Sequence, residues 1–146
     1  MAIANLTETI LSFKIRQNQL NLDITNLQGQ KSLAVYAQSD CRTLEAAKKG
    51  EVRSKYAELW KEQKLDTNYD DAYSDYTELP DYEDEIDRIV AQAQAQLDEL
   101  TAWEQALTNE ITVKSTELEE INAYLESYQA KLSANIQEDF AFGLGG

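Results

Sequence analysis

The chain has 146 residues and a formal net charge of −14, from 27 Asp and Glu against 13 Lys and Arg. We therefore expect neither nucleic acids nor anionic membrane surfaces as partners, because binding to phosphates requires an excess of basic side chains. The length suits a single domain with a modest core.

The composition also argues against catalysis. The chain has no histidine and one cysteine, Cys41. The commonest general base is thus missing, and neither a zinc site nor a Cys–His nucleophile pair can be assembled. The sequence contains no phosphate-binding loop, dinucleotide motif or nucleophile elbow. It therefore predicts a protein that is not an enzyme and has no cofactor or metal ion.

Helix breakers are scarce in this chain. It has one proline and five glycines, and three of the glycines lie among the last four residues. Long helices are therefore possible and a turn-rich sheet is not expected, so we predict an all-α fold. No stretch is apolar enough for a membrane span, and the N-terminal residues lack the pattern of a secretory signal. We expect a cytoplasmic protein by default, with leaderless export to the cell surface as the alternative.

The first predicted helix covers residues 3–65 and has a coiled-coil pattern, in which seam positions alternate at intervals of three and four. These positions are Ile3, Leu6, Ile10, Phe13, Gln17, Leu20, Ile24, Leu27, Lys31, Ala34, Gln38 and Cys41. An amphipathic helix of an ordinary bundle is the alternative, but its pattern drifts towards a period of 3.6. Within residues 42–52 the phase shifts by four residues, a stutter that contains Gly50. We expect a continuous or mildly kinked helix, with a break near Gly50 as the alternative.

An acidic, tyrosine-rich segment follows at residues 66–80, and we predict that it forms the turn between two helices. Tyr69, Tyr73 and Tyr76, together with Tyr82, have two interpretations. They pack back on the helix ends as an aromatic cap, or they form a docking patch, since tyrosine is enriched at interfaces.

The same segment has part of a calcium-loop pattern. Asp66, Asn68 and Asp70 match the first three ligand positions. Asp71, however, stands where the sharp turn needs glycine, and Thr77 stands where the loop needs its final glutamate. A solvated turn is therefore favoured over a calcium site.

The second predicted helix covers residues 81–139, after Pro80, and its acidic first turn suits the positive end of the helix dipole. Its seam positions are Ile86, Val90, Ala93, Leu97, Leu100, Glu104, Leu107, Ile111, Lys114, Leu118, Ile121, Leu125, Tyr128 and Leu132. Residues 140–146 are predicted to form a flexible tail. In that tail Phe140 and Phe142 either cap the end of the helix pair or anchor a partner.

The two predicted helices are expected to pair as an antiparallel coiled-coil hairpin. Residues 1–65 have ten Lys and Arg against seven Asp and Glu, a net charge of +3. Residues 66–146 have three Lys and Arg against twenty Asp and Glu, a net charge of −17. The two halves of the chain therefore attract each other. The predicted register pairs residues whose numbers sum to 145. It places Lys31 opposite Lys114, a polar layer that can specify register.

Several large side chains lie outside the predicted seam, which suggests that a further helix packs against the pair. We expect self-association into a bundle, and a dedicated heterologous helical partner is the alternative. The candidate interaction residues are Leu22, Leu33, Val35, Tyr36, Trp103, Tyr124, Tyr69, Tyr73, Tyr76, Phe140 and Phe142.

Two functions fit these features, and the sequence resembles no family whose motifs we recognise. The first is a non-enzymatic scaffold or adaptor that acts through helix-mediated association. The second is a subunit of an exported bacterial assembly, such as a filament, a needle or a secretion-linked component.

Overall fold

The computed structural model describes residues 2–65 and 73–145, except for the side chains of residues 144 and 145. Its elements are helix α1 (Ile3–Leu65), the short 3-10 helix η1 (Tyr76–Glu78) and helix α2 (Tyr82–Gly145). No strand occurs in this described part of the chain. The structure confirms the predicted all-α fold, in which two long helices pack against each other.

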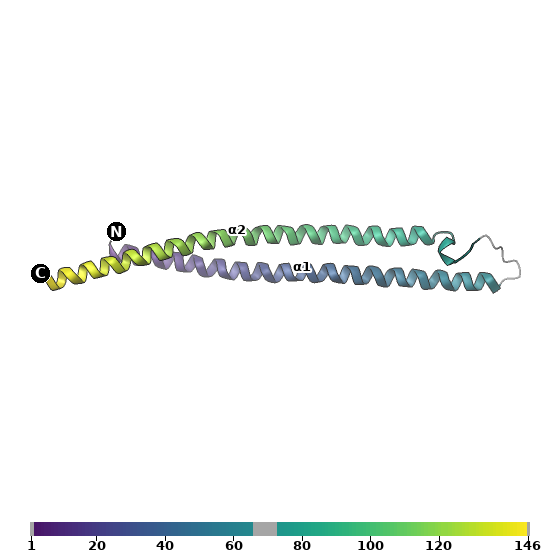
Figure 1. Ribbon diagram of the computed structural model, residues 1–146, viewed down its shortest axis with the longest axis horizontal. Coiled ribbons are helices and arrows are strands. Elements are labelled where there is room, and N and C mark those ends of the chain that lie inside the picture. Colours follow the sequence, from purple (N-terminus) through teal and green to yellow (C-terminus); the bar gives the residue numbers. More distant parts are fainter. Residues whose placement is uncertain (1, 66–72, 146) are drawn as a thin grey trace. The chain divides into compact units, whose positions relative to one another are not determined.

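The chain divides into two compact units, each built from a part of α1 and a part of α2. We call the first the terminal unit (Met1–Lys31 with Ala106–Gly146) and the second the turn unit (Ser32–Gln105). Within each unit α1 and α2 lie side by side and run in opposite directions (Figure 1). Each unit is described by itself below.

The terminal unit has an aliphatic core. Leu20 is fully buried, and it clusters with Ile10, Ile121 and Leu125. Four partly buried side chains surround this cluster, namely Phe13, Leu118, Tyr128 and Leu132. Burying a Leu or Ile side chain stabilises a fold by roughly 1.5–3 kcal/mol. These residues come from the predicted seams of both helices, so the heptad pattern correctly identified the buried face.

The turn unit has smaller buried side chains. Ala34, Cys41 and Ala93 are buried where α1 and α2 face each other, and Tyr56 and Leu79 are buried near the connection. Alanine and cysteine remove less apolar area from water than leucine does, so each layer contributes less to stability. The contrast with the aliphatic core of the terminal unit is already present in the seam residues of the sequence.

The predicted stutter lies in the turn unit, and α1 continues through it without a break at Gly50. Glu45 and Lys49 occupy the additional inward positions, and their side chains form an ion pair of 2.9 Å. On α2, Ile89 is half-buried whereas Val90 is exposed. The assignment of Val90 to the seam is therefore wrong, because the inward face of α2 also shifts opposite the stutter.

The predicted register is wrong by one heptad. Phe13 stacks on Tyr124 in the terminal unit, and Tyr56 contacts Tyr82 in the turn unit, so partner numbers sum to 137 or 138. A slip of seven residues leaves every seam position on the seam, so the apolar pattern alone does not distinguish the two registers. In the observed register Lys114 pairs with Asp23, and the predicted layer of two lysines does not form.

The C-terminal end also differs from the prediction, since α2 continues to Gly145 instead of ending near residue 139. Because of the heptad slip, the end of α2 extends past the start of α1, as Figure 1 shows. Residues 136–143, which we call the α2 tail, are all exposed. Phe142 therefore does not cover Ile3, and its side chain is 81% exposed.

Candidate interaction surfaces

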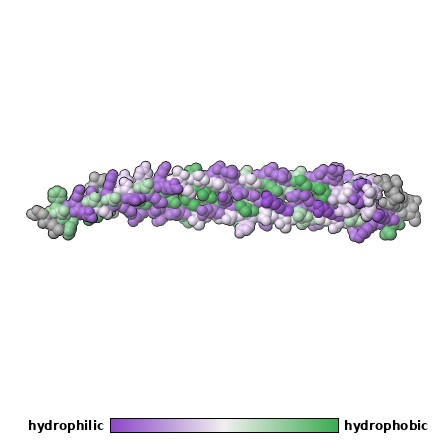
Figure 2. Space-filling model, viewed as in Figure 1, coloured by the Kyte–Doolittle hydropathy of each residue, from purple (hydrophilic) through white to green (hydrophobic). Residues whose placement is uncertain are grey.

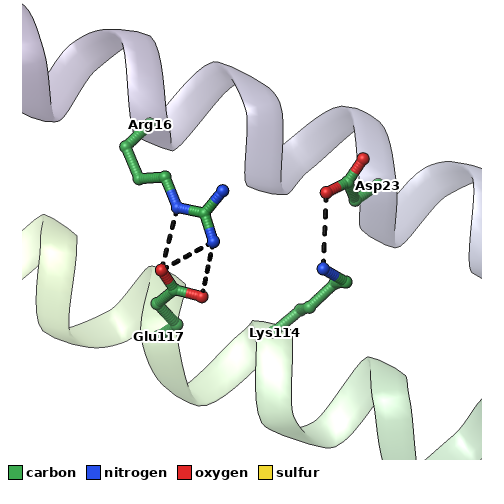
Figure 3. A network of polar contacts seen from close by, with 4 residues as sticks. All are labelled: Arg16, Asp23, Lys114 and Glu117. Carbon is green, nitrogen blue, oxygen red and sulfur yellow. Dashed lines mark hydrogen bonds and ion pairs between the residues drawn. The ribbon is translucent and has the colours of Figure 1, made fainter.

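Two ion pairs join the helices of the terminal unit (Figure 3). The Nε and Nη2 atoms of Arg16 donate hydrogen bonds of 2.8 and 2.9 Å to the two carboxylate oxygens of Glu117. Two α1 turns later, the Nζ atom of Lys114 lies 3.4 Å from an oxygen of Asp23. These pairs are half-exposed, so they specify which residues face each other more than they stabilise the fold.

An aromatic stack lies beside these pairs. The ring of Phe13 stacks on the rings of Tyr124 and Tyr128 at centroid distances of 5.5 and 5.6 Å. Lys131 places its ammonium group 5.3 Å from the centre of the Tyr128 ring. Tyr124, a predicted interaction residue, is half-exposed. One side of its ring supports the fold, and the rest of the ring is open to a partner.

The outer side of α1 in the terminal unit has an apolar stripe. Leu11, Ile15 and Leu22 are all at least half-exposed, and their spacing of four and seven residues places them on one side of the helix. Sequence reasoning identified Leu22 and missed Leu11 and Ile15. The signal was available, because the two residues lie outside the seam and repeat at a helical interval.

The turn unit has an open apolar groove of about 510 Å³ between α1 and α2. Leu44, Leu100 and Trp103 supply much of its apolar lining, Cys41 lies at its base, and Asp40 and Glu99 are acidic lining residues. Trp103 was predicted as an interaction residue, whereas Leu44, which is half-exposed, was not. Three further predicted residues on α1 of this unit are exposed, namely Leu33, Val35 and Tyr36.

Aromatic side chains also contact each other at the end of the turn unit. The ring of Tyr82 makes edge contacts with Tyr56 and Tyr76, at centroid distances of 5.3 and 5.7 Å. Tyr73 and Tyr76 are half-buried, as expected of a cap. Tyr69 lies outside the described residues.

Polar groups surround this aromatic cluster. Lys55 donates a 3.0 Å hydrogen bond to Glu85, and this bond raises the pKa of the lysine. Burial raises the pKa of Tyr56. In the connection, Asp75 accepts hydrogen bonds from the backbone N–H and hydroxyl of Thr77, which lower the pKa of its carboxyl.

Over residues 2–65 and 73–145, no three His, Cys, Asp or Glu side chains are grouped closely enough to hold a metal ion. Asp66, Asn68 and Asp70 of the calcium-loop pattern lie outside that range. Neither helix has a segment that is apolar enough, over a sufficient length, to cross a membrane, as far as the described residues extend.

Comparisons with protein-family models, with curated proteins and with solved structures found no match for this chain. The class of the protein is therefore defined by its fold, which is an all-α hairpin of two long antiparallel helices. Three exposed apolar surfaces are candidates for interaction, namely the α1 stripe, the turn-unit groove and the α2 tail.

Proposed function

We propose that this chain is a non-enzymatic scaffold that acts by self-association of its helices into a bundle. The observation that carries this proposal is the amount of apolar surface that each pair of helix segments leaves exposed. In the terminal unit alone, Leu11, Ile15, Leu22, Val113, Tyr124, Ile136, Phe140 and Phe142 are each about half-exposed or more. Figure 2 shows such apolar side chains at the surface among hydrophilic ones.

Isolated apolar side chains are normal on a protein surface, but helically spaced sets are not. A helix with apolar residues on two sides buries both sides only when it packs against two neighbours. In the terminal unit, one side of α1 packs against α2, and the stripe on its other side is left exposed by the residues that the structure describes. A four-helix or larger bundle of several copies removes that stripe from water, and this supports self-association over a monomeric role.

The alternative proposal is a subunit of an exported assembly, and it differs in the geometry of association. A scaffold forms closed dimers or tetramers, whereas a filament or needle subunit forms open-ended polymers through a head-to-tail contact. The scaffold proposal implies a cytoplasmic location, and the assembly proposal implies leaderless export. A heterologous helical partner is a third possibility, in which the purified chain stays monomeric.

Sedimentation velocity over a hundredfold concentration range, with negative-stain electron microscopy of the same samples, tests these proposals. We expect discrete dimers or tetramers whose fraction rises with concentration. Polymers of increasing length support the exported assembly instead. A chain that stays monomeric at the highest concentration overturns the self-association proposal.

A further inference from the structure

The α2 tail is a helical segment of the terminal unit in which every residue is exposed. All residues from 136 to 143 are exposed, and α1 does not extend far enough to lie beside them (Figure 1). A helical segment of about two turns is marginal in water without a packing partner. Ile136 and Phe140 lie one turn apart on the same side of the tail, and the Phe140 side chain is 67% exposed.

The α1 stripe of the same unit has a matching pattern. Leu11 and Ile15 are separated by four residues, as are Ile136 and Phe140. Lys14 directly precedes Ile15 in the stripe, and Asp139 directly precedes Phe140 in the tail. When the two segments run parallel with an offset of 125 residues, both apolar pairs and this pair of opposite charges are aligned.

We propose that the α2 tail of one copy docks on the α1 stripe of a second copy. Ile136 then lies beside Leu11 and Phe140 beside Ile15, and Asp139 faces Lys14. Two-fold symmetry repeats the contact, because each copy supplies one tail and one stripe. This inference rests on the proposed function and names the surface through which the copies associate.

The charges of the two segments favour docking of the α2 tail on the α1 stripe over docking of one α2 tail on another. The tail contains Glu138 and Asp139 and no basic residue, so two tails side by side repel each other. The first 31 residues have three Lys and Arg against two Asp and Glu, so their part of α1 is slightly basic.

A charge exchange gives the sharpest test, with the association constant measured by sedimentation equilibrium on the full chain. We expect Lys14→Glu and Asp139→Lys each to weaken association by about fivefold, as for a half-exposed ion pair. The combined variant Lys14→Glu/Asp139→Lys should recover most of the loss. Glu126→Lys is the matched control, since it changes an exposed acid of α2 outside the tail, and it should not weaken association.

Two apolar variants test the rest of the contact. Ile15→Ser and Phe140→Ser should each weaken association by at least about tenfold, because each removes a large apolar side chain from the contact. Both side chains are exposed in the single chain, so the helix content measured by circular dichroism should not change. Leu65→Ser, in which the wild-type side chain is 85% exposed at the end of α1 in the turn unit, is the control and should not weaken association.

The outcomes separate this inference from the proposed function. If the wild-type chain is monomeric, both are overturned. If it associates and the tail and stripe variants associate equally well, only the docking contact is overturned and self-association stands. If the single charge variants weaken association and the exchange does not restore it, Lys14 and Asp139 do not face each other and the proposed alignment is overturned.

Discussion

The terminal unit and the turn unit are built from the same two helices, but different types of side chain are buried in their cores. In the terminal unit the buried hydrophobic residues are leucines and isoleucines, and Leu20 lies at the centre of their cluster. In the turn unit they include Ala34, Cys41 and Ala93, with Tyr56 and Leu79 near the connection. A heptad pattern thus specifies which face is buried, and the size of the seam residues decides how much that burial stabilises.

Polar side chains at seam positions make contacts between the helices in both units. In the terminal unit Arg16 and Lys114 reach across to carboxylates beside an aliphatic core. In the turn unit Gln38 donates a 2.7 Å hydrogen bond to the half-buried Glu104, and the buried side chains beside this pair are smaller than those of the terminal unit. We therefore expect the turn unit to open first and the terminal unit to hold the helices together.

The largest expected effect is the loss of the central leucine of the terminal unit. Leu20→Ala should lower the free energy of unfolding by about 2–5 kcal/mol, because it removes a fully buried side chain. Urea denaturation followed by circular dichroism measures the loss. Leu22→Ala is the matched control when both variants are measured at a concentration at which the chain is monomeric, since the same change is made at a 62% exposed position two residues away. The control should stay within about 0.5 kcal/mol of the wild type.

A buried residue of the turn unit provides the comparison. Cys41→Ala should cost about 1 kcal/mol, because a smaller group is removed from a layer that borders an open groove. A loss as large as that of Leu20→Ala would show that the two cores contribute equally, and the contrast drawn between the units would fail.

A smaller effect, of opposite sign, is expected at the helix glycines. Apart from the neighbouring residues and the backbone of its own helix, a Cβ atom at Gly29 or Gly50 meets no atom within 4 Å. Gly50→Ala and Gly29→Ala should therefore each stabilise α1 by about 0.5–1 kcal/mol. Amide hydrogen exchange shows which part of α1 is stabilised. Gly50→Ala should slow exchange in the turn unit, and Gly29→Ala should slow exchange in the terminal unit. Equal slowing over the whole of α1 by either variant would mean that the units open together.

The observed register predicts which charges interact. Asp23→Lys should cost about 0.2–1 kcal/mol by placing two ammonium groups together, and adding Lys114→Asp should recover it. A double-mutant cycle on Lys31 and Lys114 should show coupling below about 0.3 kcal/mol. Substantial coupling in that second cycle would favour the register in which these two lysines face each other.

The smallest effect concerns pH and is confined to the connection. Hydrogen bonds from Thr77 lower the pKa of Asp75, and those from Ser74 lower the pKa of Glu78. A carboxyl whose pKa is lowered by folding stabilises the folded state above its ordinary pKa, and this contribution is lost as the pH falls through the folded value. We expect η1 to loosen below about pH 4 while the helices persist.

Protection of the Thr77 amide against hydrogen exchange, followed by NMR between pH 6 and 3, measures this loosening. Asp75→Asn should reduce the pH dependence of that protection to the part that Glu78 contributes, because the titrating acceptor of the Thr77 amide has been removed. The same pH dependence in the wild type and in the variant would contradict the assignment to Asp75.

Much of the fold follows from local sequence patterns. The scarcity of glycine and proline and the two heptad runs predict the helices. The start and end of α1, at Ile3 and Leu65, agree with the predicted range. The stutter was also visible, as a change of phase ahead of Val52. Among the surface residues, Leu22, Tyr36 and Trp103 were identified because they fall outside the seam, and all three are exposed.

What the sequence determined by itself is the all-α class and the face that each helix buries, because both depend on propensity and on spacing within one helix. The tertiary structure alone decided the register, since a slip of seven residues keeps every apolar residue on the seam and is resolved only by contacts such as Lys114 with Asp23. That choice also decided that the α2 tail extends past Ile3 and exposes Phe140 and Phe142.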